Sequence, residues 1–133
     1  MKPWQQYQQD AAELLRELGF TTVVNDSLTE PNGNVHEVDV SARRTVAGVD
    51  LLWIVECKRW NRRVPIERVA TLKAIVDGVG ADRGLLMSEQ GFQSGPIRMA
   101  VQKNITLSGL DDLRENAART FWPLESRLQT AVC

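Results

Sequence analysis

Hydrophobic residues recur every three or four positions from Trp4 to Leu18, and the next residue is a glycine. This spacing predicts an amphipathic first helix. From residue 35 to 41 apolar and polar residues alternate instead, with Val38 and Val40 on the same face, and from 51 to 55 the chain is apolar without a break. The first of these two patterns predicts a strand with one buried face, and the second predicts a central strand covered on both faces.

The remaining pattern extends this into a series of helices and strands. The predicted elements are, in order, helix 4–18, strand 21–24, loop 25–34, strand 35–41, connection 43–50, strand 51–58, helix 65–78, strand 84–87, helix 96–103, strand 105–107 and helix 110–118. A meander of strands followed by helical crossovers predicts an α/β fold, a mixed central sheet flanked by helices on both faces. The strands on either side of helix 65–78 should be parallel, because that crossover is long enough.

The chain of 133 residues is the size of one domain. We expect a single domain over residues 1–118, followed by a tail, 119–133, for which the pattern predicts no structure. No stretch approaches the ~20 consecutive apolar residues of a membrane span, and the polar N-terminus lacks the features of a signal peptide. Cys57 and Cys133 suggest neither a disulfide framework nor a paired-cysteine metal site. We therefore expect a cytoplasmic protein without membrane contact.

The net charge of −1 conceals an uneven distribution of charge along the chain. Residues 1–39 contain two basic and seven acidic residues, whereas residues 40–73 contain eight basic and three acidic ones. Trp53 and Trp60 lie among the basic residues. A segment of this kind suits a polyanion, because Lys and Arg attract phosphates regardless of base sequence. The same charges also suit a solvated loop and helix face.

The strand that ends at Lys58 turns abruptly from apolar to polar. Glu56 and Lys58 share one face of that strand, and Cys57 points the other way, into the core. If this strand pairs with strand 35–41, Asp39 converges with Glu56 and Lys58 at one end of the sheet. Two carboxylates suit a hard cation such as Mg²⁺, and a nearby lysine would stabilise negative charge developing on a phosphate. A surface ion pair explains the same spacing without any chemistry.

Four segments together resemble the Mrr-like restriction endonucleases, a branch of the PD-(D/E)xK nuclease superfamily. They are Glu37-Val38-Asp39-Val40, Val55-Glu56-Cys57-Lys58-Arg59-Trp60, Gly84-Leu85-Leu86-Met87-Ser88 and Gly91-Phe92-Gln93-Ser94-Gly95. The resemblance covers roughly residues 4–113 and implies a restriction-endonuclease-like fold with DNA cleavage that depends on Mg²⁺, for which Mn²⁺ substitutes. By position it makes Asp39 and Glu56 the metal ligands and, together with Lys58, the catalytic residues.

Two positions depart from the family's pattern. Members often carry a glutamate on the first helix, where this chain has Gln8, an amide that offers an oxygen but no charge. The superfamily's proline before the aspartate is Val38 here. Gln8 and Glu37, which shares the face of Asp39, are candidate accessory residues. His36 falls on the opposite face, so we expect a structural or solvent-facing role for it.

The basic run directly after the catalytic strand is the candidate DNA-binding segment. Its members are Arg59, Trp60, Arg62 and Arg63. We expect the guanidinium groups to contact the phosphate backbone beside the cut and Trp60 to pack on a sugar or base. The alternative is a basic loop in which Trp60 serves only packing. The loop from 88 to 95 precedes a predicted helix, whose N-terminal N–H groups would also suit a phosphate.

The sequence and the resemblance together predict a Mg²⁺-dependent DNA endonuclease, with a possible role in defence against foreign DNA. One active site cuts one strand, and better-known members carry a separate recognition domain. We therefore expect a homodimer or association with a DNA-recognition partner. Two alternatives stay open. One is a non-catalytic module of the same fold that binds DNA or a protein, and the other is a structure-selective nuclease that resolves DNA junctions.

Overall fold

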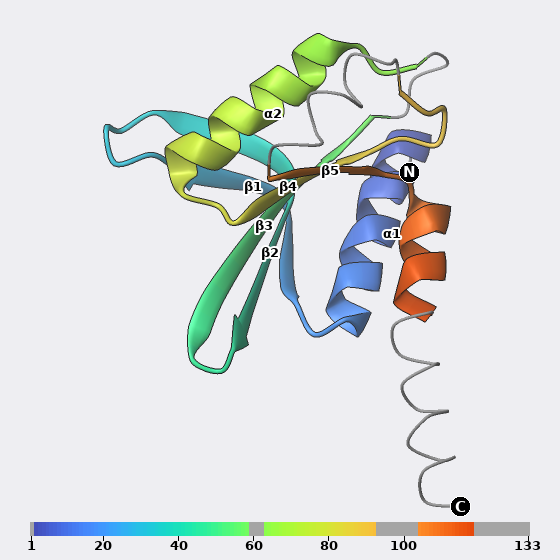
Figure 1. Ribbon diagram of the computed structural model, residues 1–133, viewed down its shortest axis with the longest axis horizontal. Coiled ribbons are helices and arrows are strands. Elements are labelled where there is room, and N and C mark those ends of the chain that lie inside the picture. Colours follow the sequence, from blue (N-terminus) through green and yellow to red (C-terminus); the bar gives the residue numbers. More distant parts are fainter. Residues whose placement is uncertain (1, 59–62, 93–103, 119–133) are drawn as a thin grey trace, which may run out of the picture.

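The computed structural model describes residues 2–58, 63–92 and 104–118. Its centre is a five-stranded sheet in the order β1-β2-β3-β4-β5. α2 (Ile66–Val79) covers one face of this sheet, and α1 (Pro3–Glu17) and a helix over residues 110–118 cover the other (Figure 1). The predicted mixed sheet with helices on both faces is therefore confirmed.

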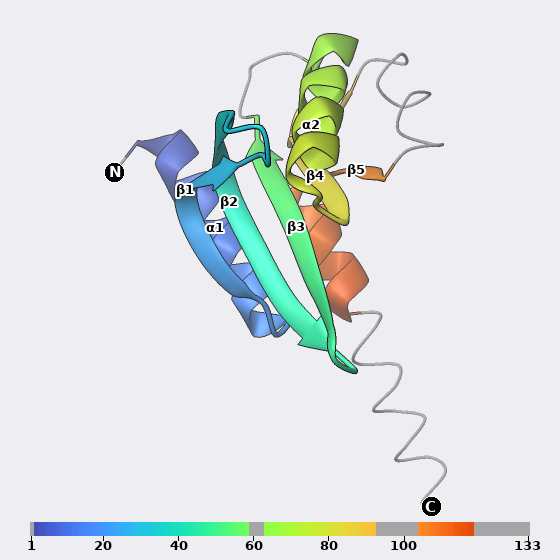
Figure 2. The ribbon, with the colours of Figure 1, turned by 90° about the vertical axis from the view of Figure 1, so that its left-hand side faces the viewer.

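The strands combine an antiparallel meander with a parallel crossover. β1 (Thr21–Thr29), β2 (Val35–Val46) and β3 (Val49–Cys57) are antiparallel neighbours, and Figure 2 shows them side by side. α2 then connects β3 to β4 (Arg83–Met87), which is parallel to β3, as predicted, and to β5 (Ile105–Ser108). The N-terminal half of β2 and the C-terminal ends of β3 and β4 consequently meet at one end of the sheet.

The meander strands run further than the sequence pattern predicts. β1 continues through residues 25–29, where a loop was expected, and β2 and β3 extend through most of the expected connection 43–50. A two-residue turn joins β2 to β3, with φ of 52° at Ala47 and 79° at Gly48. Two positive φ values in a two-residue loop match the turn that fits the twist of a hairpin. The expected helix 96–103 and the tail lie outside the described residues.

β1 and β2 both change the face that they bury midway along their length. Val40 packs in the cluster that contains α1, whereas Val38, two residues earlier, packs in the cluster that contains α2. The prediction that the two valines share a face is therefore wrong. The alternation breaks at Asp39, opposite Asn25, whose φ of 54° is left-handed. The pairing register is the same on both sides of this point, so the buried face changes at Asp39 without an inserted residue.

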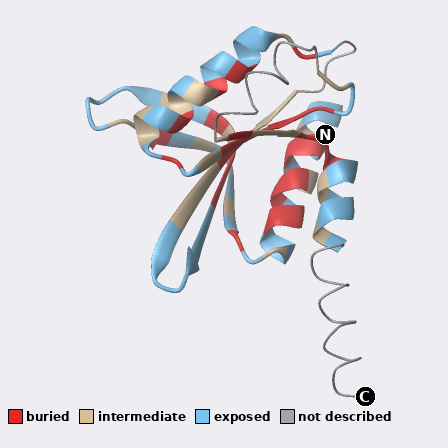
Figure 3. Cartoon of the chain, in the orientation of Figure 1, coloured by how far each residue is buried: buried red, intermediate tan, exposed pale blue. Residues whose placement is uncertain are grey.

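Two hydrophobic clusters hold the layers together, one on each face of the sheet. Figure 3 shows the buried residues on the sides of the helices and strands that face each other. Leu15 of α1 and Leu72 of α2, which are 0% and 1% exposed, lie in separate clusters. Among the described residues, no helix is long and apolar enough to cross a membrane.

Candidate active site

Asp39 is held from two sides. The backbone N–H of Cys57, at the end of β3, donates to Asp39 Oδ2 over 2.8 Å, and the side-chain amide of Gln8, on α1, donates to Asp39 Oδ1 over 3.0 Å. Gln8 is itself only 4% exposed. Both carboxylate oxygens of Asp39 therefore have a fixed donor, and each keeps a lone pair for a further partner.

Glu56 and Lys58 lie beside Asp39 at the end of β3. Lys58 Nζ is 3.5 Å from Glu56 Oε2, and the backbone N–H of Asp39 makes a long, 3.4 Å, hydrogen bond to Glu56 Oε1. Both side chains are mostly buried. The three residues that the sequence singled out thus converge, as predicted, at the end of the sheet opposite the β2–β3 turn.

Burial and the neighbouring charges change the pKa of Glu56. Burial raises its pKa to about 7; the negative charge of Asp39 contributes to the increase, and the positive charge of Lys58 opposes it. Burial also raises the pKa of the neighbouring Cys57 thiol, and the charge of Asp39 adds to that effect. Burial is thus the main reason that these two groups hold their protons more tightly than usual, and the neighbouring charge of Asp39 adds to it.

The two carboxylates fit a hard divalent cation. Within the described ranges, no group of three or more His, Cys, Asp or Glu residues is arranged to hold a metal ion by itself. Mg²⁺ does not require such a group, because it is commonly held by one or two carboxylates, waters and substrate phosphate oxygens. A cation between Asp39 and Glu56 would also relieve the repulsion that raises the pKa of Glu56.

A cavity of about 160 Å³, which we call the Glu56 cavity, opens beside these residues between the sheet and α2. Glu37 and Glu56 line it from β2 and β3, Lys58 lines it from the position directly after β3, and Arg68 and Thr71 line it from α2. Sequence reasoning did not identify the two α2 residues. They lie on a helix whose pattern predicts only a buried apolar stripe, so no local signal marks them.

The comparison with protein families decides the affiliation of the chain. A family model for the Mrr catalytic domain, described as a restriction endonuclease, matches residues 2–116. The chain belongs to this restriction endonuclease family. No curated protein is similar enough in sequence to count as a relative.

Solved structures agree with the restriction-endonuclease-like fold. AF1548, a protein of unknown function, is 23% identical with a TM-score of 0.70, and the match covers 86% of this chain and 66% of that one. MspJI restriction endonuclease in complex with a 27-mer oligonucleotide is 20% identical, with a TM-score of 0.52, over 80% of this chain and 25% of that one. The DNA modification-dependent restriction endonuclease AspBHI is 17% identical, with a TM-score of 0.55, over 85% and 34%. At these identities the likeness shows the fold alone, and this chain spans a quarter to two thirds of the length of those proteins.

The other predicted site residues of this restriction endonuclease family chain are spread more widely. Gln8 contacts Asp39, and Glu37 lines the Glu56 cavity. His36 pairs with Glu30 across 2.6 Å. Arg63 is exposed, and the other three members of the predicted DNA-binding run, Arg59, Trp60 and Arg62, lie outside the described residues.

A polar contact that the sequence did not reveal fixes α1 close to the site. The hydroxyl of Tyr7 donates to Glu89 Oε1 over 2.7 Å, and the backbone N–H of Leu110 donates to the same oxygen. Burial raises the pKa of Tyr7, and the hydrogen bond to Glu89 adds to the effect. Because 82 residues separate the two side chains, no local spacing could have indicated the pair. The contact holds in place the helix turn that carries Gln8.

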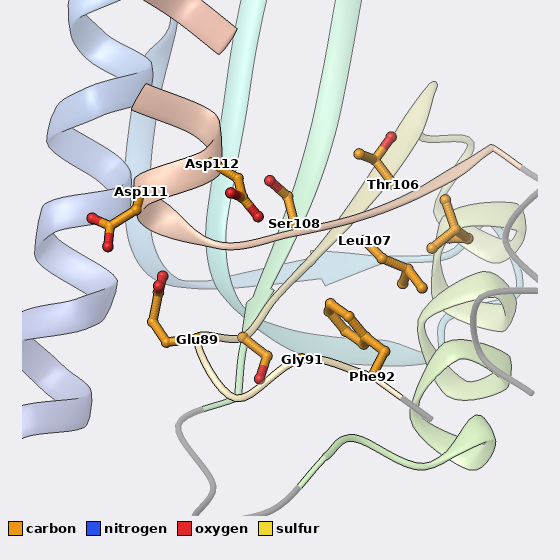
Figure 4. A pocket seen from close by; sticks show the side chains of 10 residues that line it. Glu89, Gly91, Phe92, Thr106, Leu107, Ser108, Asp111 and Asp112 are labelled. Carbon is orange, nitrogen blue, oxygen red and sulfur yellow. The ribbon is translucent and has the colours of Figure 1, made fainter. Parts of the chain in front are cut away.

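A larger hollow, of about 670 Å³, lies where β4 and β5 end (Figure 4). Among the described residues, its lining includes Glu89, Asp111 and Asp112, no lysine or arginine, and none of the three converging residues. Carboxylates repel phosphate groups, so this hollow does not suit a nucleic-acid backbone. The candidate site of this family member is the end of β2 and β3, because Asp39, Glu56 and Lys58 converge there.

Proposed function

We propose that this chain is a DNA endonuclease domain that hydrolyses phosphodiester bonds with a divalent cation, Mg²⁺ or Mn²⁺. The observation that carries the proposal is the convergence of Asp39, Glu56 and Lys58 in a chain of the restriction endonuclease family. A surface ion pair between Glu56 and Lys58 does not account for the buried amide of Gln8 on Asp39. It also does not account for the hydrogen bond from the backbone of Cys57 that holds the other oxygen of Asp39.

Each residue has a distinct task in this proposal. Asp39 and Glu56 hold the cation, which when bound supplies an activated water and positive charge on the phosphoryl oxygen. Hydrogen bonds from Cys57 and Gln8 fix the Asp39 carboxylate before any ligand arrives, so little reorganisation is needed on binding. Lys58 places its ammonium group against the phosphate as negative charge develops there. Hydrolysis in this manner leaves a 5′-phosphate, as the family resemblance implies.

DNA is the proposed partner. MspJI, which shares the fold, is described in complex with an oligonucleotide. The basic run that begins after Lys58, which includes the exposed Arg63, is the proposed backbone contact. One site cuts one strand, so cleavage of both strands requires a homodimer or association with a recognition partner. Restriction of foreign DNA by such an assembly is the proposed biological role.

The proposal is tested by nicking of supercoiled plasmid with Mg²⁺, with Mn²⁺ and with EDTA. Asp39→Asn removes a charge from the cation site while keeping the shape of the side chain. We expect it to lower the nicking rate by about 100-fold or more, since a site that orients reacting groups loses most of its effect when one ligand fails. Asp10→Asn is the matched control, because it removes the same charge from a residue of α1 that accepts a hydrogen bond from Gln6 instead of lying at the site. This variant should nick like the wild type. Equal nicking by Asp39→Asn, or nicking that survives EDTA, contradicts the proposal.

A non-catalytic DNA-binding module is the second candidate, and Gln8 is the observation that favours it. Its amide brings no negative charge to the site, whereas family members often carry a glutamate on this helix. This candidate predicts DNA binding without cleavage in every metal tested. The substrates for that comparison are plasmid, modified duplex and four-way junctions, and cleavage of junctions alone would identify a structure-selective nuclease.

A further inference from the structure

The Glu56 cavity has a cationic residue on each of its two walls. Lys58 lines it from the end of β3, and Arg68 lines it from the first turn of α2. The helix holds Arg68 at a fixed place relative to the sheet, because the next residue, Val69, is 0% exposed and Leu72 is 1% exposed. The cavity is therefore bounded by two positive charges, one on α2 and one on the residue directly after β3, whose backbone N–H donates to the carbonyl of Met87 over 2.8 Å.

Of the polar residues that α2 contributes to the cavity, Arg68 is the one suited to bind an anion. The hydroxyl of Thr71 donates its proton to the backbone carbonyl of Glu67 over 2.9 Å. Its oxygen can then only accept, and a phosphate oxygen offers no proton at neutral pH. A guanidinium group carries five N–H donors and matches two phosphate oxygens at once. The carboxylates of Glu37 and Glu56, on the other wall, repel a phosphate unless a cation or an arginine offsets them.

We propose that Arg68 contacts a backbone phosphate of the bound DNA strand and holds that strand across the Glu56 cavity, opposite Lys58. This inference rests on the proposed function, because it assigns Arg68 to substrate binding at the same site. Lys58 acts on the phosphate that is cut, and Arg68 holds a neighbouring phosphate. This contact does not contribute to sequence specificity, because the phosphate group has the same chemistry at every nucleotide.

The test is DNA binding measured with Ca²⁺ in place of Mg²⁺ over a series of salt concentrations. Arg68→Ala should weaken binding on the order of tenfold, the effect of losing one charged hydrogen-bonding group. It should also reduce the slope of log affinity against log salt by about 0.9, the value for one phosphate contact on duplex DNA. Arg68→Lys keeps the charge and should keep the slope. Arg114→Ala, which removes an arginine paired with Asp111 outside the cavity, should leave both quantities unchanged.

A second variant and a second readout separate this inference from the proposed function. Arg68→Gln removes the charge but keeps a polar side chain with an aliphatic stem, and it serves if Arg68→Ala does not fold, as judged by its melting temperature. If the wild type cuts DNA while both neutral variants keep the wild-type salt slope, the Arg68 contact is wrong and the endonuclease proposal stands. If the wild type never cuts but the neutral variants still show the reduced salt slope, Arg68 binds DNA and the endonuclease proposal fails. In Mg²⁺, a true contact raises KM more than it lowers kcat.

Discussion

Two carboxylates of the same charge sit side by side at the end of β3, but their surroundings differ. Asp39 accepts a hydrogen bond on each oxygen, both within 3.0 Å, whereas Glu56 accepts a long bond from the backbone of Asp39 and lies 3.5 Å from Lys58. Hydrogen bonds to a carboxylate favour its charged form, and burial without them favours the protonated form. Burial, with the charge of Asp39 adding to it, raises the pKa of Glu56 to about 7, so the charge of Glu56 changes near neutral pH.

The raised pKa of Glu56 predicts a pH-dependent stability for the protein without metal. Glutamate titrates near 4.5 in the unfolded chain and near 7 in the folded one. As pH rises between these values, the unfolded chain loses its proton first, so the free energy of unfolding falls, by up to about 3 kcal/mol. Glu56→Gln, which stays neutral, should abolish this fall.

Urea denaturation at pH 5 and pH 8 in EDTA measures the effect. Glu13→Gln, on the exposed side of α1, is the matched control and should keep the wild-type fall in stability. A fall of the same size in Glu56→Gln would mean that another group causes it, and that the pKa of Glu56 is not raised in the folded protein.

At the scale of elements, the sequence pattern was reliable where burial is regular and failed where it is not. α1, α2, β3 and β4 were predicted because each buries one stripe or an unbroken run. Both sides of the β2–β3 hairpin beyond residue 42 are exposed until residue 51, so no alternation marks those strands. The second half of β1 contains polar residues, one of which, Asp26, accepts a hydrogen bond from the buried Ser41. Polar pairing inside a sheet leaves no hydrophobic signal to read.

Gly84 in β4 lets α2 approach the sheet closely enough to form the second wall of the Glu56 cavity. A Cβ atom at this position would lie 2.9 Å from side-chain atoms of Leu72, Val76 and Ile105. Gly84→Ala should therefore push α2 outward and cost about 1–3 kcal/mol, the usual penalty for overpacking.

Thermal unfolding measures that cost, and Val76→Ala in the same background should recover part of it by removing one of the three contacts. An unchanged melting temperature in Gly84→Ala would mean that the packing of α2 on β4 is looser than the structure indicates.

At the scale of the whole molecule, the fold brings together residues that the sequence pattern could only align. Alternation predicted that Asp39 and Glu56 could meet, but it did not predict that the buried face of β2 changes at Asp39, near the left-handed backbone of Asn25. Gln8 and Arg68 reach the site from helices on opposite faces of the sheet. Contacts of this kind depend on how layers stack, which local patterns do not specify.

The most direct test of the central claim is Mg²⁺-dependent nicking of supercoiled DNA by the wild type and by Lys58→Ala. The wild type should nick. Lys58→Ala should bind DNA and Mg²⁺, but its nicking rate should be lower by about 100-fold or more, because it lacks the charge that stabilises the phosphate as it reacts. Lys73→Ala, on α2 and paired with Asp77 at 2.7 Å, is the matched lysine control and should nick normally. Nicking at the wild-type rate by Lys58→Ala would contradict the proposed role of this site.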